Sequence, residues 1–512
     1  MSPALLFCIL IAYFALLLGV AWATSRNANN DSFFIGNKSS NWMLVAFGMV
    51  GTTLSGATFI SVPGAVGIDG FGYGQVLIGY VFGYIAVVYL LLPLYYRLKL
   101  TSIYTYLDGR LGRRAYQSGA GFFILSRLFG ATARLYLVVA VLQDIILDGL
   151  GIPFWLTTFV ILGMILLYTY QGGVKTIVWT DTLQTTCMLG GLFACVWFML
   201  GQLDLTIPQA LQQMNERGLS RVFTFDADSP NFWLKQIVAG AFIVVTMTGM
   251  DQEMMQKNIS VRTLKDSQKN VITLGLILLG VILLFLFLGG LLHLYALQQG
   301  AHWQTTVVNG KEVTQLILNG SNITADRLFP ALAIQYMPPA FGIIFIIALI
   351  SALFPSADGA ITALTSSFCI DILGIQRNAA LGEKARKRIR QRVHLAFAVI
   401  FLVCVLVFKW RNSPSMIGEI LKLAGYTYGP LLGLFAFGIF TQRKINDRYA
   451  PVICLFAPAA CYFLDRYQAV LFRGYQIGFE LLIINGLITF IGLLLISRPI
   501  EKSTAESSLA GL

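Results

Sequence analysis

The chain is built from long apolar segments separated by short polar ones. A helix that crosses a bilayer needs about 20 mostly apolar residues, so this pattern predicts an all-α integral membrane protein. About thirteen segments qualify as spans, and they cover residues 3–23, 42–68, 74–97, 118–147, 153–171, 176–203, 233–256, 270–298, 339–373, 393–410, 417–440, 448–464 and 476–497. The first segment lacks a basic leading region and a clear small-residue cleavage site, so we interpret it as an anchor rather than a signal peptide.

One stretch departs from the apolar pattern in the middle of a span. Residues Met49–Val66 have the sequence MVGTTLSGATFISVPGAV, in which glycines, hydroxyl residues and a proline interrupt the span. Irregular backbone inside a membrane survives only where it lines a protein-walled cavity, and its freed carbonyl oxygens can bind small cations. The stretch therefore predicts a broken helix at an ion and solute site. The alternative is a close helix–helix contact through small residues.

The order of the spans predicts an internal repeat within one domain, because no long linker divides residues 1–512. The parts are a leading helix, two sets of five spans and trailing helices, at residues 3–23, 42–203, 233–440 and 448–497. Because five is odd, the two sets enter the membrane from opposite sides, which is the inverted-repeat plan of many transporters. The span at 233–256 is interrupted at Gly249, in the place that matches the break of the second span.

Composition agrees with a membrane protein. Only 12% of the 512 residues are charged and mean hydropathy is +0.73, whereas soluble domains carry about 25% charged residues. The net charge of +12 comes from Lys and Arg in short loops, which is a topology signal and gives no support for nucleic-acid binding. The placement of these basic residues predicts a plasma (inner) membrane protein with the N-terminus outside and the C-terminus cytoplasmic.

The basic residues collect in the loops that this topology places inside. They are Arg26, Lys38, Lys99, Arg110, Arg113, Arg114, Lys175, Lys257, Arg262, Lys265, Lys269, Arg443, Lys444, Arg448, Arg498, Lys502 and six residues of the run Lys384–Arg392. We interpret that run as a solvated cytoplasmic face, with lipid headgroups as the other partner it could take. The two long loops, 204–232 and 299–338, then lie outside.

Cysteine and histidine usage gives no sign of a catalytic or metal centre. All seven cysteines fall in or at the ends of apolar segments without CxxC spacing, and the three histidines are not clustered. A disulfide framework, a zinc site or a redox centre is therefore not expected. A nucleophile elbow and a paired-carboxylate motif are also missing from the sequence, so we do not expect an enzyme.

A few ionisable residues fall within predicted spans, where they are costly and usually functional. Arg134, Asp181 and Asp358 belong to this group, and Asp358 is surrounded by serines and threonines. Hydroxyls, carbonyls and a carboxylate are the oxygen ligands that a hard cation such as Na⁺ prefers. Asp251 and Glu253 lie near the end of a span, so solvation is the simpler expectation for them. For Arg134, the alternative to substrate contact is an internal ion pair with a carboxylate such as Asp181.

Three motifs in this order resemble those of the sodium/solute symporter family. GGVKTIVWTDTLQ (Gly172–Gln184) is similar to its GG…A…TD…Q signature, and SADGAITALTSSFCIDIL (Ser356–Leu373) is similar to its SADS…SS…DI helix. GPLLGLFAFGIFTQR (Gly429–Arg443) resembles its GPLLGLFLLGIF motif. The resemblance covers nearly the whole chain. It implies sodium-coupled import of a small organic solute, with Na⁺ as the co-transported ion.

The resemblance also implies where sodium binds. The main site would use backbone carbonyls of the broken helix and the hydroxyl face of the ninth span, at Gly51, Leu54, Ala352, Pro355 and Ser356. Pro355 departs from the family, where many members have a hydroxyl residue. A second site, as in the sialic-acid branch, would involve Asp181 and Asp358, but Gly359 stands where that branch has another hydroxyl.

Substrate contacts are implied by similarity to the same branch. TTLSGATFISVP (Thr52–Pro63) is similar to its TTLS..TF.S.P pattern, which implies substrate-binding roles for Thr53, Ser55, Thr58 and Arg134, with Gln75 and Met247 as weaker matches. A guanidinium beside hydroxyls is a suitable carboxylate receptor. We therefore expect a carboxylate-bearing solute such as sialic acid or another organic acid. Met247, where sugar carriers have a tyrosine, disfavours a sugar.

The sequence is also compatible with other functions. The same family includes sugar and amino-acid symporters, and a sodium-independent facilitator or channel could use the same broken helix. A solute sensor is disfavoured, because only about fourteen residues follow Arg498. The expected partners are the solute, Na⁺ and membrane lipid, and no obligate protein partner is implied.

Overall fold

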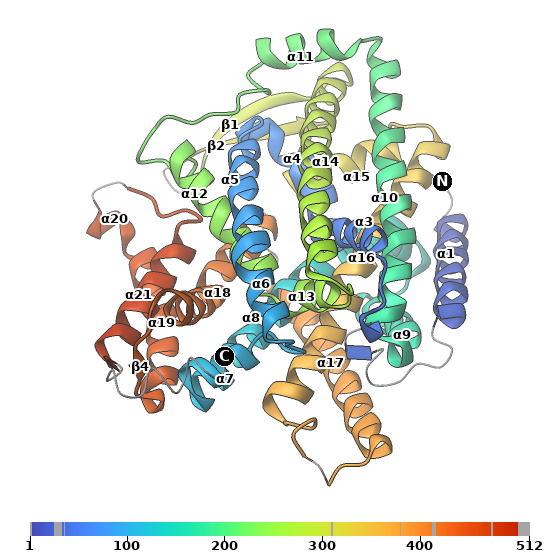
Figure 1. Cartoon of the computed structure of the whole chain (residues 1–512). Coiled ribbons are helices and arrows are strands. Elements are labelled where there is room, and N and C mark those ends of the chain that lie inside the picture. Colours follow the sequence, from blue (N-terminus) through green and yellow to red (C-terminus); the bar gives the residue numbers. More distant parts are fainter. Residues whose placement is uncertain are drawn as a thin grey trace.

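The structure is a computed structural model that describes residues 3–24, 33–34, 36–308, 311–378, 380–411, 416–472 and 475–499. It is an all-α bundle of long helices with two small sheets at its ends (Figure 1). The first five-span set consists of α3 (Trp42–Thr53), α4 (Gly56–Asp69), α5 (Tyr73–Ala86), α6 (Leu92–Arg97), α8 (Arg113–Leu142), α9 (Phe154–Gly172) and α10 (Val174–Leu203). The second consists of α12 (Trp233–Val244), α13 (Gln252–Ile259), α14 (Leu264–Gln298), α16 (Pro339–Ser367), α17 (Glu383–Arg411) and α18 (Met416–Phe440).

Shorter elements flank and connect these helices. The flanking helices are α1 (Pro3–Thr24), α19 (Ala450–Arg466) and α21 (Leu481–Leu495), and the connecting ones are α7 (Thr105–Leu111), α11 (Ile207–Glu216), α15 (Ala325–Gln335) and α20 (Gln468–Leu471). Each of the thirteen predicted spans coincides with one helix or one helix pair. Among the described residues, eight helices are long and apolar enough to cross a membrane, or ten spans if each of two bent pairs counts as one. The number thirteen itself stays a prediction.

The two bent pairs lie where the sequence predicts broken helices. The axes of α3 and α4 differ by 57°, and those of α12 and α13 by 61°. The first break follows from local chemistry, because α3 ends at Thr53 and Ser55 adopts an extended conformation before α4 begins. In the second, a π-helical turn, Val245–Gly249, ends α12. The broken-helix prediction is confirmed at both places.

Helix α16 lies at the centre of the bundle. Every side chain from Ala348 to Ser367 is buried, and the helix packs against α3, α4, α8, α10 and α13. Small residues allow this close approach. A Cβ on Gly191 of α10 would lie 2.4 Å from the Ala348 Cβ, and one on Gly56 would lie 3.8 Å from the Ala352 carbonyl carbon. The broken helices are therefore held against a helix that is buried along most of its length.

The long loop at 299–338 contains strands that the sequence analysis did not predict. β1 (His302–Val308), β2 (Lys311–Leu318) and β3 (Ser321–Ile323) form an antiparallel sheet. The ring of Trp303 stacks on His293 of α14 with centroids 6.0 Å apart and planes 9° apart. This sheet and α11 lie at one end of the bundle, whereas α7, the start of α17 and the pair β4 (Lys444–Ile445) and β5 (Ser497–Arg498) lie at the other (Figure 1).

Candidate functional site

A central cavity of about 90 Å³ lies between the two bent pairs and α8. Its lining includes five residues predicted to bind substrate, namely Thr53, Ser55, Thr58, Arg134 and Met247. The remaining lining is mostly aromatic and apolar, with Thr52, Ala57, Tyr73, Tyr80, Tyr84, Arg127, Ile243, Val244, Thr248, Met254, Ile420 and Leu421. A mostly apolar lining with a few convergent polar groups is typical of small-molecule sites.

The break in the second span places the three hydroxyls around this cavity. Thr53 is in the last turn of α3, Ser55 is in the extended link, and Thr58 is in the first turn of α4. The Thr53 hydroxyl donates to the Met49 carbonyl at 2.9 Å, so its lone pairs stay available to a ligand. An unbroken helix would spread these side chains around its circumference.

Arg134 brings a positive charge to the same cavity from α8. It is half-buried, and it forms no ion pair within the part of the chain that the structure describes. An ion pair with Asp181, the alternative considered from the sequence, is wrong because Asp181 pairs with Lys257 at 2.7 Å. The guanidinium is therefore left for a group that enters the cavity.

Gln75 does not reach the central cavity. It lines an adjoining cavity of about 270 Å³ together with Asp69, Arg221 and Asn231. Its amide nitrogen donates to the Gly72 and Asn231 carbonyls at 3.1 and 3.3 Å, and its oxygen accepts from the Thr224 N–H at 3.3 Å. The two cavities share Tyr73 and Leu421.

The five residues expected to bind the main sodium ion lie on α3, on its C-cap and on α16, and two of them, Gly51 and Pro355, are close together. A Cβ on Gly51 would lie 3.7 Å from Pro355 Cγ. The last carbonyls of a helix lack intrahelical partners, so the end of α3 provides oxygens at Gly51 and Leu54. On α16, Ser356 donates its hydroxyl to the Leu353 carbonyl at 2.8 Å, which leaves its lone pairs available to a cation.

Pro355 removes a hydroxyl from this region but frees a carbonyl. Proline has no N–H, so the Ser351 carbonyl, one turn earlier in α16, loses its helical partner. The Ser351 hydroxyl donates to Tyr13 of α1 at 2.8 Å. The set of oxygens fits a small hard cation, although only Ser356 among the five contributes a side-chain oxygen.

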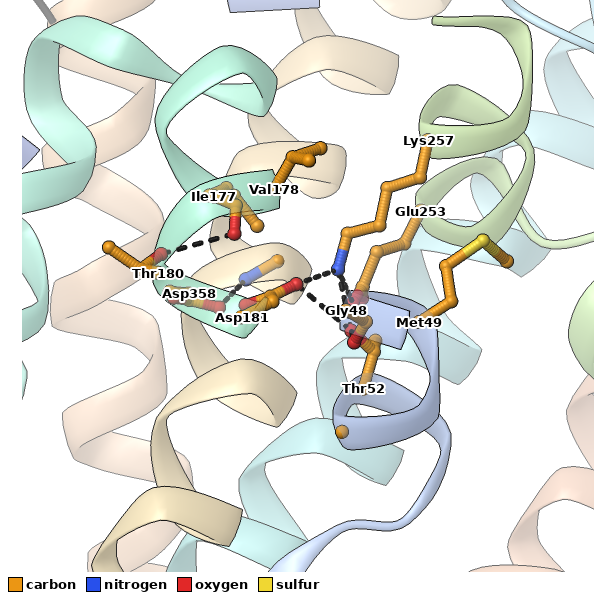
Figure 2. A network of polar contacts seen from close by, with 12 residues as sticks. Gly48, Met49, Thr52, Ile177, Val178, Thr180, Asp181, Glu253, Lys257 and Asp358 are labelled. Atoms are coloured by element: carbon orange, nitrogen blue, oxygen red, sulfur yellow. Dashed lines mark hydrogen bonds and ion pairs between the residues drawn. The ribbon is translucent and has the colours of Figure 1, made fainter. Parts of the chain in front are cut away.

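Asp181 lies in a buried polar network beside this region. Lys257 donates to Asp181 Oδ2 at 2.7 Å and to Thr52 Oγ1 at 2.6 Å, and the Thr52 hydroxyl donates to the same carboxylate oxygen at 3.1 Å. Figure 2 shows Lys257 extending from α13 to meet Asp181 of α10 and Thr52 of α3. The network therefore joins three helices at the break of the second span.

Two further carboxylates from the second bent pair join the network. Glu253 forms an ion pair with Arg127 of α8, and Arg127 also lies 3.7 Å from Asp251. Asp251 caps α13 by accepting from the backbone N–H of Glu253 at 2.9 Å, and it accepts the Tyr428 hydroxyl at 2.7 Å. The expectation that Asp251 and Glu253 are solvated is wrong, because both are buried.

Asp358 is also buried, and Figure 2 shows it beside Asp181. It accepts the Tyr168 hydroxyl at 2.7 Å. Glu253 explains why position 359 is a glycine, because a Cβ on Gly359 would lie 2.3 Å from Glu253 Oε1. The Glu253 carboxylate thus occupies the space that a side chain at position 359 would need.

Lys257 and Arg127 are the residues that sequence reasoning missed. Lys257 was assigned to an inner loop, yet every residue of α13 from Gln252 to Ile259 is buried. One signal was available, because Glu253 and Lys257 are four residues apart and therefore share a helix face.

Comparisons with known proteins agree with this geometry. A sequence model of the sodium:solute symporter family matches residues 33–450. The sodium/sialic acid symporter SiaT of Proteus mirabilis (strain HI4320) is 22% identical over 458 residues, which is 85% of this chain and 85% of that protein. The sodium-coupled monocarboxylate transporter 1 of Mus musculus is 24% identical over 428 residues, which is 82% of this chain and 66% of that protein. A substrate-bound, outward-open structure of a Na⁺-coupled sialic acid symporter has a TM-score of 0.79 at 19% identity, over 97% of this chain and 99% of that chain.

A cavity between two broken helices of an inverted-repeat bundle defines a secondary transporter. The chain belongs to the sodium:solute symporter family. It is therefore an integral, multi-pass membrane protein that couples Na⁺ to a small organic solute, and it is a carrier rather than an enzyme.

Proposed function

We propose that the protein imports a carboxylate-bearing organic solute, with sialic acid as the first compound to test. The observation that carries this proposal is Arg134, whose half-buried guanidinium lines the central cavity with Thr53, Ser55 and Thr58 and forms no ion pair in the described part of the chain. A guanidinium can bind a carboxylate through two parallel hydrogen bonds. The two relatives named above, a sialic acid symporter and a monocarboxylate transporter, support the same solute class by their names.

Sodium would bind beside the cavity, between the end of α3 and Ser356 of α16. The ion would be held by the carbonyls of Gly51, Leu54 and Ala352, by the hydroxyl of Ser356 and by the backbone at Pro355. Because Thr53 and Ser55 belong to the same broken helix, an ion at its end would also order the hydroxyls that meet the solute. A sodium gradient can drive uptake only if the ion binds one conformation more tightly than the other.

The solute would enter through the adjoining cavity, past Tyr73 and Leu421. At about 90 Å³, the central cavity is small beside typical ligand sites of about 300–1,000 Å³. The two cavities would therefore merge when solute enters. We place the 299–338 sheet outside and α7 and the start of α17 inside, because Arg110 of α7 and the run Lys384–Arg392 of α17 are basic. These two elements lie at the end of the bundle opposite the sheet (Figure 1). In this orientation the N-terminus is outside a plasma (inner) membrane and the C-terminus is cytoplasmic.

The test is uptake by purified protein in proteoliposomes. We expect radiolabelled sialic acid, or another organic acid found by a thermal-shift screen, to accumulate above its external concentration only with an inward sodium gradient. Uptake that equilibrates without accumulation in any gradient would identify a facilitator or channel. Accumulation of neutral sugars or amino acids with no organic acid would overturn the solute class.

Replacing the cavity arginine tests the carboxylate contact. Arg134→Met should lower organic-acid uptake at least about tenfold, because a hydrogen-bonded charge contact is worth roughly 1.5–3 kcal/mol. Sodium binding should survive, since Arg134 is not among the sodium ligands. The control is Arg113→Met, which removes an exposed arginine from the same helix. Equal uptake by the two variants would remove Arg134 from the site.

A further inference from the structure

The ammonium of Lys257 lies on the carboxylate that the family resemblance assigns to a second sodium ion. The Lys257 side chain is 3% exposed. The Lys257 Nζ lies 2.7 Å from Asp181 Oδ2, 2.6 Å from Thr52 Oγ1 and 3.8 Å from Glu253 Oε1. Three oxygens from three helices thus surround one buried positive charge (Figure 2).

The remaining oxygens of a second sodium site are also altered. Gly359 offers no side chain, and the Glu253 carboxylate fills its space. Asp358 accepts a hydrogen bond from Tyr168 at 2.7 Å. Glu253 and Asp358 thus belong to the same buried group of residues as the Asp181–Lys257 contact.

A sodium ion and the Lys257 ammonium are not compatible on one buried carboxylate. Both carry a single positive charge, and their repulsion is strong in a low-dielectric interior. Asp181 Oδ1 accepts no hydrogen bond from the described residues. Removing the ammonium would leave the Asp181 carboxylate with the Thr52 hydroxyl but without a positive charge, and it would attract a small cation because a buried charge without an opposite charge is costly.

We propose that Lys257 is the resident cation of the second site. It neutralises Asp181 in place of a second sodium ion, so that the protein binds a single Na⁺, at the site beside Ser356. This inference rests on the proposed sodium site. It assigns Lys257 a role in stoichiometry, as a residue that sets how many ions accompany each solute.

The experiment counts sodium ions bound to purified protein, with ²²Na⁺ as the probe and no solute. The wild type should bind one ion per chain with a Hill coefficient of about 1. Lys257→Ala should bind one ion more than the wild type, and its melting temperature should rise more steeply with sodium. Lys257→Ala combined with Asp181→Asn should lose the added ion, because the carboxylate that attracts it is gone.

The control is Lys265→Ala, which removes an exposed lysine eight residues along the chain and should leave the count unchanged. Two ions on the wild type, or the same count on the wild type and on Lys257→Ala, would overturn the inference. If Lys257→Ala does not fold, the wild-type count still decides. Ser356→Ala separates the two proposals, because loss of the wild-type ion in that variant reports on the main site alone.

Discussion

Ser356 carries the one side-chain oxygen among the five residues assigned to the main sodium site. Its hydroxyl is buried and oriented by the Leu353 carbonyl at 2.8 Å, so it can present lone pairs to an ion without reorganisation. Ser356→Ala should raise the sodium concentration for half-maximal uptake about tenfold or more, since a contact to a charge is worth roughly 1.5–3 kcal/mol. A sodium titration of initial uptake rates measures this.

The neighbouring position allows the reverse experiment. Pro355→Ser would supply a second hydroxyl one residue earlier on α16, next to Gly51. We expect the half-maximal sodium concentration to fall several-fold, with a similar maximal rate. An unchanged sodium dependence in both variants would show that the ion binds elsewhere.

At the scale of single residues, the sequence predicted the side chains that line the central cavity better than it predicted the buried charged side chains. The similarity of the Thr52–Pro63 stretch to the sialic-acid branch implied substrate contacts at Thr53, Ser55 and Thr58, and all three residues line one cavity. Lys257 was missed because it follows the last residue of a predicted span, where a lysine is normally solvated. Only the 61° bend before α13 turns it into the interior. That bend angle depends on packing between helices far apart in sequence.

Among the elements, α13 depends on a glycine of another helix. Gly359 of α16 leaves room for the Glu253 carboxylate, which would lie 2.3 Å from an added Cβ. Gly359→Ala should therefore displace Glu253 from Arg127 and lower the free energy of unfolding by about 2 kcal/mol, as overpacking typically does. Thermal unfolding in detergent, with and without sodium, is the measurement.

Gly190→Ala in α10 is the matched control. A Cβ on Gly190 would meet no atom within 4 Å, so the substitution should stabilise the helix by up to about 1 kcal/mol. If Gly359→Ala melts at the same temperature as Gly190→Ala, the contact between α13 and α16 is looser than described.

Helices and breaks were accessible to sequence reasoning, whereas the sheet was not. Apolar runs of span length predict helices directly, and small polar residues within a run predict a break. β1 and β2 lie in a long loop that the sequence analysis treated only as an outer connection, and their pairing links positions such as Trp303 and Leu316. Such pairs are set by tertiary structure rather than by one local pattern.

For the whole molecule, the proposed solute path depends on Leu421, which lines both cavities. In a variant without accessible native cysteines, Leu421→Cys should react with a membrane-impermeant thiol reagent from outside, and bound solute should slow the reaction several-fold. Uptake of solute by the unlabelled variant confirms that it is folded.

The matched control is Gln442→Cys, which lies at the opposite end of the bundle. Gln442 is exposed beside Arg110 and Thr441, so it should react only from inside. Labelling of the two positions from the same side would contradict the proposed orientation. The odd number of spans in each half predicted opposed halves, but the two adjoining cavities depend on how helices far apart in the sequence pack together.

The stacking of Trp303 on His293 gives the protein a natural optical probe. A Cβ on Gly67 of α4 would lie 2.3 Å from His293 Nε2 and 2.6 Å from Trp303 Cη2, so α4 lies against both rings. Any tilt of α4 must change the surroundings of this indole. Its fluorescence, isolated by comparison with Trp303→Phe, should report opening and closing in real time, without an attached dye.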